Sequence, residues 1–207
     1  METAEEYWET FYRDRGQVWT GKVNELLARE VAHLAPGAAL DLGCGEGGDA
    51  LWLAGRGWRV TAVDVSATAM ARGAAQAAEA GLADRIDWQR HDLGSSFPSG
   101  EFDLVSAQFL HSTVAPEGER EGILARAAKA VAPGGVLLVV GHAAGPSWAD
   151  HQELADFRFP TNADVLAAVD PGPEWVVEVD ELVEREMTGP HGEHGTRSDC
   201  VLRLRRG

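Results

Sequence analysis

A short apolar run that ends in closely spaced glycines constrains this chain more than any other feature. Residues 38–42 read Ala-Ala-Leu-Asp-Leu, and four glycines follow almost at once: Gly43, Gly45, Gly47 and Gly48. A helical pattern begins at Ala50, so the order predicts a buried strand, a tight turn and a helix N-terminus. Glycine suits this turn because it adopts positive φ and lets a ligand approach the backbone closely. The unpaired N–H groups of the helix favour ligands with anionic or acceptor groups.

The glycine loop is compatible with two classes of cofactor. The motif Gly43-x-Gly45-x-x-Gly48, with Asp64 about 20 residues on, fits the dinucleotide fingerprint of NAD-binding proteins. The motif Asp41-x-Gly43-x-Gly45-x-Gly47 instead resembles motif I of the class I S-adenosylmethionine (SAM)-dependent methyltransferases. A carboxylate at Asp41 would repel a pyrophosphate, whereas it would suit a cofactor that carries an ammonium and a sulfonium group. The motif therefore favours SAM.

Length and composition indicate one globular domain. The chain has 207 residues and 44% hydrophobic residues, enough for a sizeable core. No apolar run approaches the ~20 residues needed to span a bilayer. The first residues are acidic and lack the basic and apolar segments of a signal peptide, so we expect a cytoplasmic protein without a membrane partner.

The net charge of -15 bears on partners. It disfavours nucleic acid and anionic membranes, and it favours neutral or cationic methyl acceptors over anionic ones. The two cysteines, Cys44 and Cys200, are expected to be reduced thiols. Cys44 is interpreted as a small loop residue, with a nucleophilic role as the alternative.

Strand and helix patterns alternate along the chain. Repeated β-α-β units predict an α/β fold with a doubly wound, mostly parallel seven-stranded sheet, and two consecutive strands at the end predict an antiparallel C-terminal hairpin with a polar loop at 189–195. Residues 1–37 are expected to form a helical lid, with helices at 2–14 and from Asn24 onward, ahead of a core at 38–207. Strands are expected at 38–42, 58–64, 85–90, 102–107, 136–140, 174–187 and 197–205, and core helices from Ala50 and at 66–80, 117–132 and 162–169.

Four features in order carry a resemblance to a known family. They are motif I at 41–47, Asp64 at the end of the second strand, Asp92 after the third, and Pro133-Gly134-Gly135 before the fifth. This order resembles small bacterial class I SAM-dependent methyltransferases of the tellurite-resistance and thiopurine types. The stretch Val18-Trp19-Thr20-Gly21-x-x-Asn24 is similar to one just ahead of the core in that group. The resemblance implies a Rossmann-like fold, SAM as cofactor, S-adenosylhomocysteine (SAH) as product and a small-molecule acceptor.

Ligands of open α/β sheets bind beyond the carboxyl ends of the strands, where several polar residues are expected. Asp64 could bind a ribose diol, and Asp92 could accept from the adenine amine with help from the Leu93 N–H; a helix cap and a turn are their respective alternatives. Gln108 could contact the methionine part. Trp19 could pack beside the cofactor or the acceptor. The predicted cofactor residues are Trp19, Asp41, Gly43, Cys44, Gly45, Gly47, Asp64, Val65, Asp92, Leu93 and Gln108.

Charged residues near the predicted site have less specific roles. Lys22, Arg13 and Arg15 are candidate partners of the methionine carboxylate, and solvent-exposed charge is the alternative for each. Asp103 begins its strand, so we expect it at the opposite end of the sheet, where it would be structural.

Histidines are the candidate catalytic groups, because their ordinary pKa lies near neutrality. His111 follows the fourth strand and His142 follows the fifth, and His191 and His194 occupy the last hairpin. A general base is needed only where the acceptor loses a proton. We predict His111 and His142 as catalytic residues and no metal, since His191-x-x-His194 lacks a metal-site context.

The sequence thus predicts a SAM-dependent methyltransferase that acts on a small molecule. An NAD-dependent oxidoreductase with the same loop is one alternative, although the chain lacks a Tyr-x-x-x-Lys pair. A SAM-binding regulatory protein without catalysis is the other.

Overall fold

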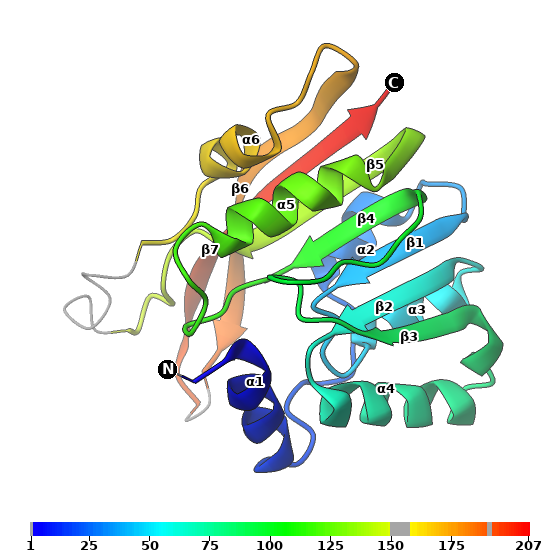
Figure 1. The fold of residues 1–207 in the computed structure, drawn as a ribbon. Helices are drawn as coiled ribbons and strands as arrows, with labels where there is room; N and C mark the ends of the chain where they lie inside the picture. The colour runs from blue at the N-terminus through cyan, green and yellow to red at the C-terminus, as the bar shows by residue number, and fades with distance from the viewer. Residues whose placement is uncertain (1, 150–157, 190–191) are drawn as a thin grey trace.

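A seven-stranded sheet organises the computed structural model, which describes residues 2–149, 158–189 and 192–207 (Figure 1). The strand order is β3-β2-β1-β4-β5-β7-β6. Only β7 runs antiparallel to its neighbours, and the other adjacent pairs are parallel. The predicted mostly parallel sheet with an antiparallel hairpin is confirmed. The strands are β1 (Ala38–Leu42), β2 (Arg59–Asp64), β3 (Ile86–Arg90), β4 (Phe102–Gln108), β5 (Val131–His142), β6 (Trp175–Thr188) and β7 (His194–Arg206).

Helices cover both faces of the sheet, each over its own apolar cluster (Figure 1). One layer contains α2 (Glu25–Val31), α3 (Gly48–Gly55) and α4 (Ala67–Glu79), and the other contains α5 (Glu119–Lys129) and α6 (Asn162–Val169). Successive side chains of β5 alternate between the clusters: Leu137 packs under α5, whereas Leu138 packs toward α2. This two-sided burial explains the continuous apolar run of that strand. No helix in the described part of the chain could cross a membrane.

Most boundaries agree with those expected from the sequence, and α6 occupies residues 162–169 as predicted. Two differ. Strand β5 begins at Val131, five residues early, because it pairs with β4 through a register shift and carries Gly134 at φ +80° within it. Strand β7 begins at His194, so this histidine is a strand residue rather than a loop residue. A short 3₁₀ turn, η1 (Ala83–Arg85), also precedes β3.

The N-terminal segment divides into two parts with different surroundings. Helix α1 (Ala4–Arg13) begins with a capping box of Thr3 and Glu6 and lies at the carboxyl ends of the parallel strands (Figure 1). Helix α2, capped by Asn24, instead places Leu27 in the core at 0% exposure. Within the proposed lid, residues 4–13 thus lie over the strand ends, whereas α2 belongs to the core.

Candidate functional site

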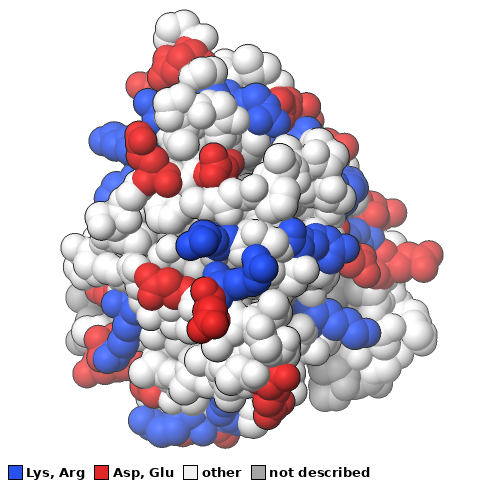
Figure 2. All heavy atoms as spheres, turned by 90° about the vertical axis from the view of Figure 1, so that its right-hand side faces the viewer, with Lys and Arg blue, Asp and Glu red and all other residues white. Residues whose placement is uncertain are grey.

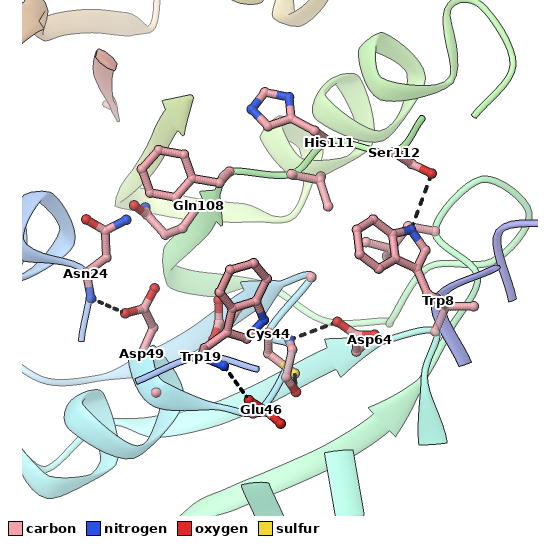
Figure 3. Close-up of a pocket in the computed structure, with 18 of the residues that line it drawn as sticks. Trp8, Trp19, Asn24, Cys44, Glu46, Asp49, Asp64, Gln108, His111 and Ser112 are labelled. Atoms are coloured by element: carbon pink, nitrogen blue, oxygen red, sulfur yellow. Dashed lines mark hydrogen bonds between the residues drawn. The ribbon is translucent and has the colours of Figure 1, made fainter. Parts of the chain in front are cut away.

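A cavity of about 890 Å³ lies at the carboxyl ends of β1, β2, β4 and β5, beneath α1 and the segment that follows it (Figure 3). Its volume is in the range of small-ligand sites. On the lid side, the Trp8 indole donates to the Ser112 hydroxyl at 3.3 Å. The structure brings all the predicted site residues except Gly47 into its lining: Trp19, Asp41, Gly43, Cys44, Gly45, Asp64, Val65, Asp92, Leu93, Gln108, His111 and His142.

The glycine loop has the tight geometry that its sequence predicts. Gly43, Gly45 and Gly47 have φ of +71°, +53° and +80°. The N–H groups of Gly43 and Cys44 both donate to the Val63 carbonyl, at 2.8 and 2.9 Å, which turns the chain sharply after β1. Gly47 does not line the cavity, and a Cβ there would lie 2.4 Å from the Trp88 ring, so this glycine packs closely behind the loop; its cofactor contact stays a prediction.

Three carboxyl groups gather at the loop end of the cavity. Asp41 is 2% exposed and its Oδ2 has no partner in the described chain; burial, with Asp49 and Asp64 nearby, raises its pKa well above the usual range. Burial raises the pKa of Asp49 to about 6, although the Asn24 N–H donates to it at 2.6 Å. Burial also raises the pKa of Asp64, which accepts from Gly45 N–H at 2.8 Å. This end favours a cationic ligand.

Asp92 and Gln108 combine contacts within the chain with a place in the cavity. Asp92 accepts from the Gly94 N–H at 3.0 Å and the Ser95 hydroxyl at 3.1 Å, which is the turn role that the sequence also allowed. Gln108 ends β4 and donates to the Ser106 hydroxyl at 2.9 Å, while its Oε1 is buried without a partner among the described residues. Gln108 is thus free to donate or accept toward a ligand.

A buried carboxylate that the sequence analysis missed fixes the lid segment. Glu46 is 2% exposed and accepts from the N–H groups of Val18 at 3.0 Å and Trp19 at 2.9 Å. Arg72 on α4 pairs with Glu46 at 2.9 Å. The same guanidinium donates to main-chain carbonyls at the end of α1 and just beyond it: Tyr12, Arg15 and Gly16. We call Glu46 and Arg72 the lid latch; only the fold brings them together.

The structure separates the three candidate partners of the methionine carboxylate. Lys22 lines the cavity. Arg13 lies 3.4 Å from Asp14, and Arg15 packs over the Phe11 ring at 4.2 Å, and neither lines the cavity. Asp103 accepts from the Ala38 N–H at the amino end of β1, which agrees with its expected structural role.

The two predicted catalytic histidines lie together. The rings of His111 and His142 stack with centroids 5.8 Å apart. His142 is held by Asp199 at 2.8 Å and Arg197 at 3.1 Å. The expectation of a pKa near neutrality is wrong for His111, because burial and the positive charge of Arg120 lower its pKa to about 4. His111 is therefore a neutral imidazole at physiological pH.

His194 lies apart from this pair, and Cys44 has little reactivity. His194 contacts the Thr188 hydroxyl at 3.3 Å in a separate hollow, and His191 lies outside the described residues. The described residues contain no group of three or more His, Cys, Asp or Glu side chains placed so that they could hold a metal ion. Burial and the charges of Asp64 and Asp41 raise the pKa of the Cys44 thiol, which makes it a poor nucleophile.

Comparison with known proteins matches the glycine-loop half of the chain. Residues 39–135 match the family model described as "Methyltransferase domain". The chain is 35% identical over 111 residues to a probable tocopherol O-methyltransferase, chloroplastic, of Oryza sativa subsp. japonica (53% of this chain, 30% of that protein). It is 34% identical over 140 residues to a ribosomal RNA small subunit methyltransferase C of Alcanivorax borkumensis (65% and 42%). The chain thus spans less than half the length of these relatives.

Solved structures match over nearly the whole chain. One concerns the conversion of a disulfide bond into a thioacetal group during echinomycin biosynthesis; it is 26% identical with a TM-score of 0.72, over 98% of this chain and 92% of that one. TehB from Haemophilus influenzae is 16% identical with a TM-score of 0.72, over 96% and 67%. These matches extend to α1 and the terminal hairpin, beyond the residues of the family model.

Proposed function

We propose that the chain transfers the methyl group of SAM to a small-molecule acceptor, as a class I SAM-dependent methyltransferase; the match of residues 39–135 to the methyltransferase domain and the similarity of the fold support this. SAM is the cofactor that these similarities support, which agrees with the prediction from motif I and disfavours NAD. The observation that carries the proposal is a single cavity that extends from the glycine loop to the histidine pair. Such a cavity can hold a cofactor and an acceptor side by side.

The residues at the loop end fit SAM on chemical grounds. The unpartnered, buried Oδ2 of Asp41 would accept from the ammonium group, and Asp49 adds negative charge beside it. Asp64 would accept from the ribose, and Lys22 would pair with the methionine carboxylate. SAM supplies an electrophilic methyl group on a sulfonium.

The protein's own contribution is alignment and exclusion of water. Helix α1 and Trp19 cover the cofactor end, held by the lid latch. His111 and His142 line the far end of the cavity, where they would orient the acceptor. The neutral imidazole of His111 can take a proton from an acceptor that must lose one.

Charge distribution supports a small acceptor over a nucleic acid. The chain carries a net charge of -15, and on the face shown in Figure 2 the Lys and Arg side chains are interspersed with Asp and Glu. A nucleic acid partner is normally held by a broad basic surface. The ribosomal RNA methyltransferase relative makes RNA the alternative to test.

Two measurements test this function. Calorimetric titration with SAM, SAH and NAD should show binding of SAM and SAH alone. Release of SAH should then be followed with thiol, amine, hydroxyl and carboxylate acceptors, and with ribosomal RNA. Turnover with RNA but with no small molecule would refute the proposed acceptor class. SAM binding without any turnover would favour the regulatory SAM-binding protein.

A further inference from the structure

The end of the cavity opposite the carboxyl groups is rich in positive charge. Its lining includes Arg120 of α5, Arg185 of β6 and Arg197 of β7, beside the two histidines. Buried Asp199 balances one of them, since it forms an ion pair with Arg185 and also holds His142. Neither Arg120 nor Arg197 forms an ion pair within residues 2–149, 158–189 and 192–207. Within the described part of the chain these two guanidinium groups thus have no direct ion-pair partner, although the charge of Asp199 acts on Arg197.

Several polar atoms at this end are buried without a partner in the described chain: Gln108 Oε1, His111 Nε2, Arg120 Nη1 and Arg197 Nε. Each such atom destabilises the ligand-free protein when it lacks a hydrogen bond. Unpartnered buried polar groups are few in native proteins, so the two guanidinium donors and the His111 nitrogen point to a ligand that accepts from them, whereas Gln108 Oε1 is itself an acceptor and does not pair with an anion.

The internal contacts of the two arginines fix where their free donors lie. Arg120 uses Nε for the Leu110 carbonyl at 3.1 Å, and Arg197 uses Nη1 for His142 Nε2 at 3.1 Å. A Cβ built on Gly141 would lie 3.7 Å from both Arg120 Nη2 and His111 Nε2, so these two groups flank the same point of β5. Two positioned cations and a histidine therefore border one small volume.

We propose that the methyl acceptor carries a carboxylate, which Arg120 and Arg197 bind beside His111. This inference rests on the proposed methyl transfer and specifies its acceptor. The planar guanidinium groups match a carboxylate, and the resulting charge-assisted hydrogen bonds would satisfy the free arginine donors. The net charge of the chain led us to expect a neutral or cationic acceptor, but the local field at this end of the cavity favours an anion.

The cavity is thus divided by charge. The carboxyl groups of Asp41, Asp49 and Asp64 lie toward the glycine loop, and His111 lies at the opposite end in Figure 3. The cationic part of SAM and an anionic acceptor would each meet the opposite charge. This arrangement orients the two molecules relative to each other.

The test uses the wild-type protein saturated with SAH and pairs of small probes. Benzoate, salicylate and indole-3-acetate should bind more tightly than their amides in calorimetric titrations. Arg120→Met and Arg197→Met should each weaken carboxylate binding about tenfold or more, the effect of losing a charge-assisted hydrogen bond. Arg158→Met is the matched control, because Arg158 is 83% exposed and lies outside the cavity lining.

Three results would overturn the proposal. Equal binding of amides and carboxylates would show that the charge is not recognised. Failure of every carboxylate, and of inorganic sulfate, to bind the SAH complex would show that this end of the cavity binds no anion. A tenfold loss of SAH affinity in Arg120→Met or Arg197→Met would assign the arginines to the cofactor's own carboxylate. A wild-type protein that binds no SAH would instead refute the proposed function.

Discussion

Substituting Asp41 should change the stability of the protein and its affinity for SAM in opposite directions. Asp41→Asn keeps the size of the side chain and removes a carboxylate that is 2% exposed, has an unpartnered Oδ2 and lies near two other acids. We expect the ligand-free variant to be more stable than the wild type. We expect its affinity for SAM to fall, since the ammonium group would lose a charged acceptor.

The magnitudes follow from the burial of that carboxyl group. The amide keeps a polar atom at the position of Oδ2, so the gain comes from removing the buried charge; because an unsatisfied charged group costs more than a neutral one, the free energy of unfolding should rise by about 1–3 kcal/mol at pH 8. For a chain of this size, 1 kcal/mol shifts Tm by about 2–4 °C, which gives a rise of about 2–12 °C. A lost hydrogen bond to a charged group is worth about 1.5–3 kcal/mol, so SAM should bind about 10- to 100-fold more weakly.

The stability gain of Asp41→Asn should depend on pH. The folded state raises the pKa of Asp41 above its ordinary 3.8. Between pH 3.8 and this raised pKa, the folded protein therefore binds more protons than the unfolded chain. Wild-type stability therefore falls as pH rises through that window, whereas the variant lacks this penalty. The gain should be larger at pH 8 than near pH 4.

Differential scanning calorimetry and SAM titration at several pH values provide the assay. Asp103→Asn is the control, because Asp103 is an exposed acid at the amino end of β4. The control should leave SAM affinity unchanged and bring no stability gain. An Asp41→Asn gain of equal size at pH 8 and pH 4, or an unchanged SAM affinity, would refute the reasoning.

Other predictions concern the lid latch and the titratable groups. Arg72→Met should speed proteolysis within residues 14–20 about tenfold, or ~1.4 kcal/mol of lost protection, and equal cleavage rates would contradict the latch. His111→Ala should depress methyl transfer at least about tenfold more than His142→Ala, with near-normal SAM binding. Full activity of the His111→Ala variant would show that His111 has only a structural role. NMR titration should place the His111 pKa near 4 and higher in Arg120→Met, and an unchanged value would exclude a charge effect of Arg120. SAM affinity should fall as pH decreases through about 6, where Asp49 gains a proton; a flat profile would remove Asp49 from SAM binding.

The sequence predicts the geometry of the glycine loop well, because its signals are local. The strand before the loop, the positive-φ glycines and Asp64 all lie within one β-α-β unit, where spacing determines geometry. Gly47 fits the same pattern and also packs closely against Trp88, a contact that spacing alone does not reveal.

The acceptor end depends on long-range contacts, which the sequence pattern does not contain. Arg120 and Arg197 come from α5 and β7, and they meet the histidines only once the sheet order is fixed. The lid latch likewise joins the glycine loop to α4 and α1. The sequence pattern does not indicate that these arginines are buried, and the net charge of the chain does not show where individual charges lie.

The pairing of β5 with β7 has a consequence for how such a protein could change its substrate. His142 pairs directly with Asp199, and the same strand continues into core residues such as Leu202. The core fixes the register, because a one-residue slip would turn every side chain of β7 to the other face. On the proposed division of the cavity, substitutions at the start of β7 would alter the molecule that is methylated while the glycine loop kept its cofactor. New specificities could thus arise by exchange of a few side chains on an unchanged scaffold.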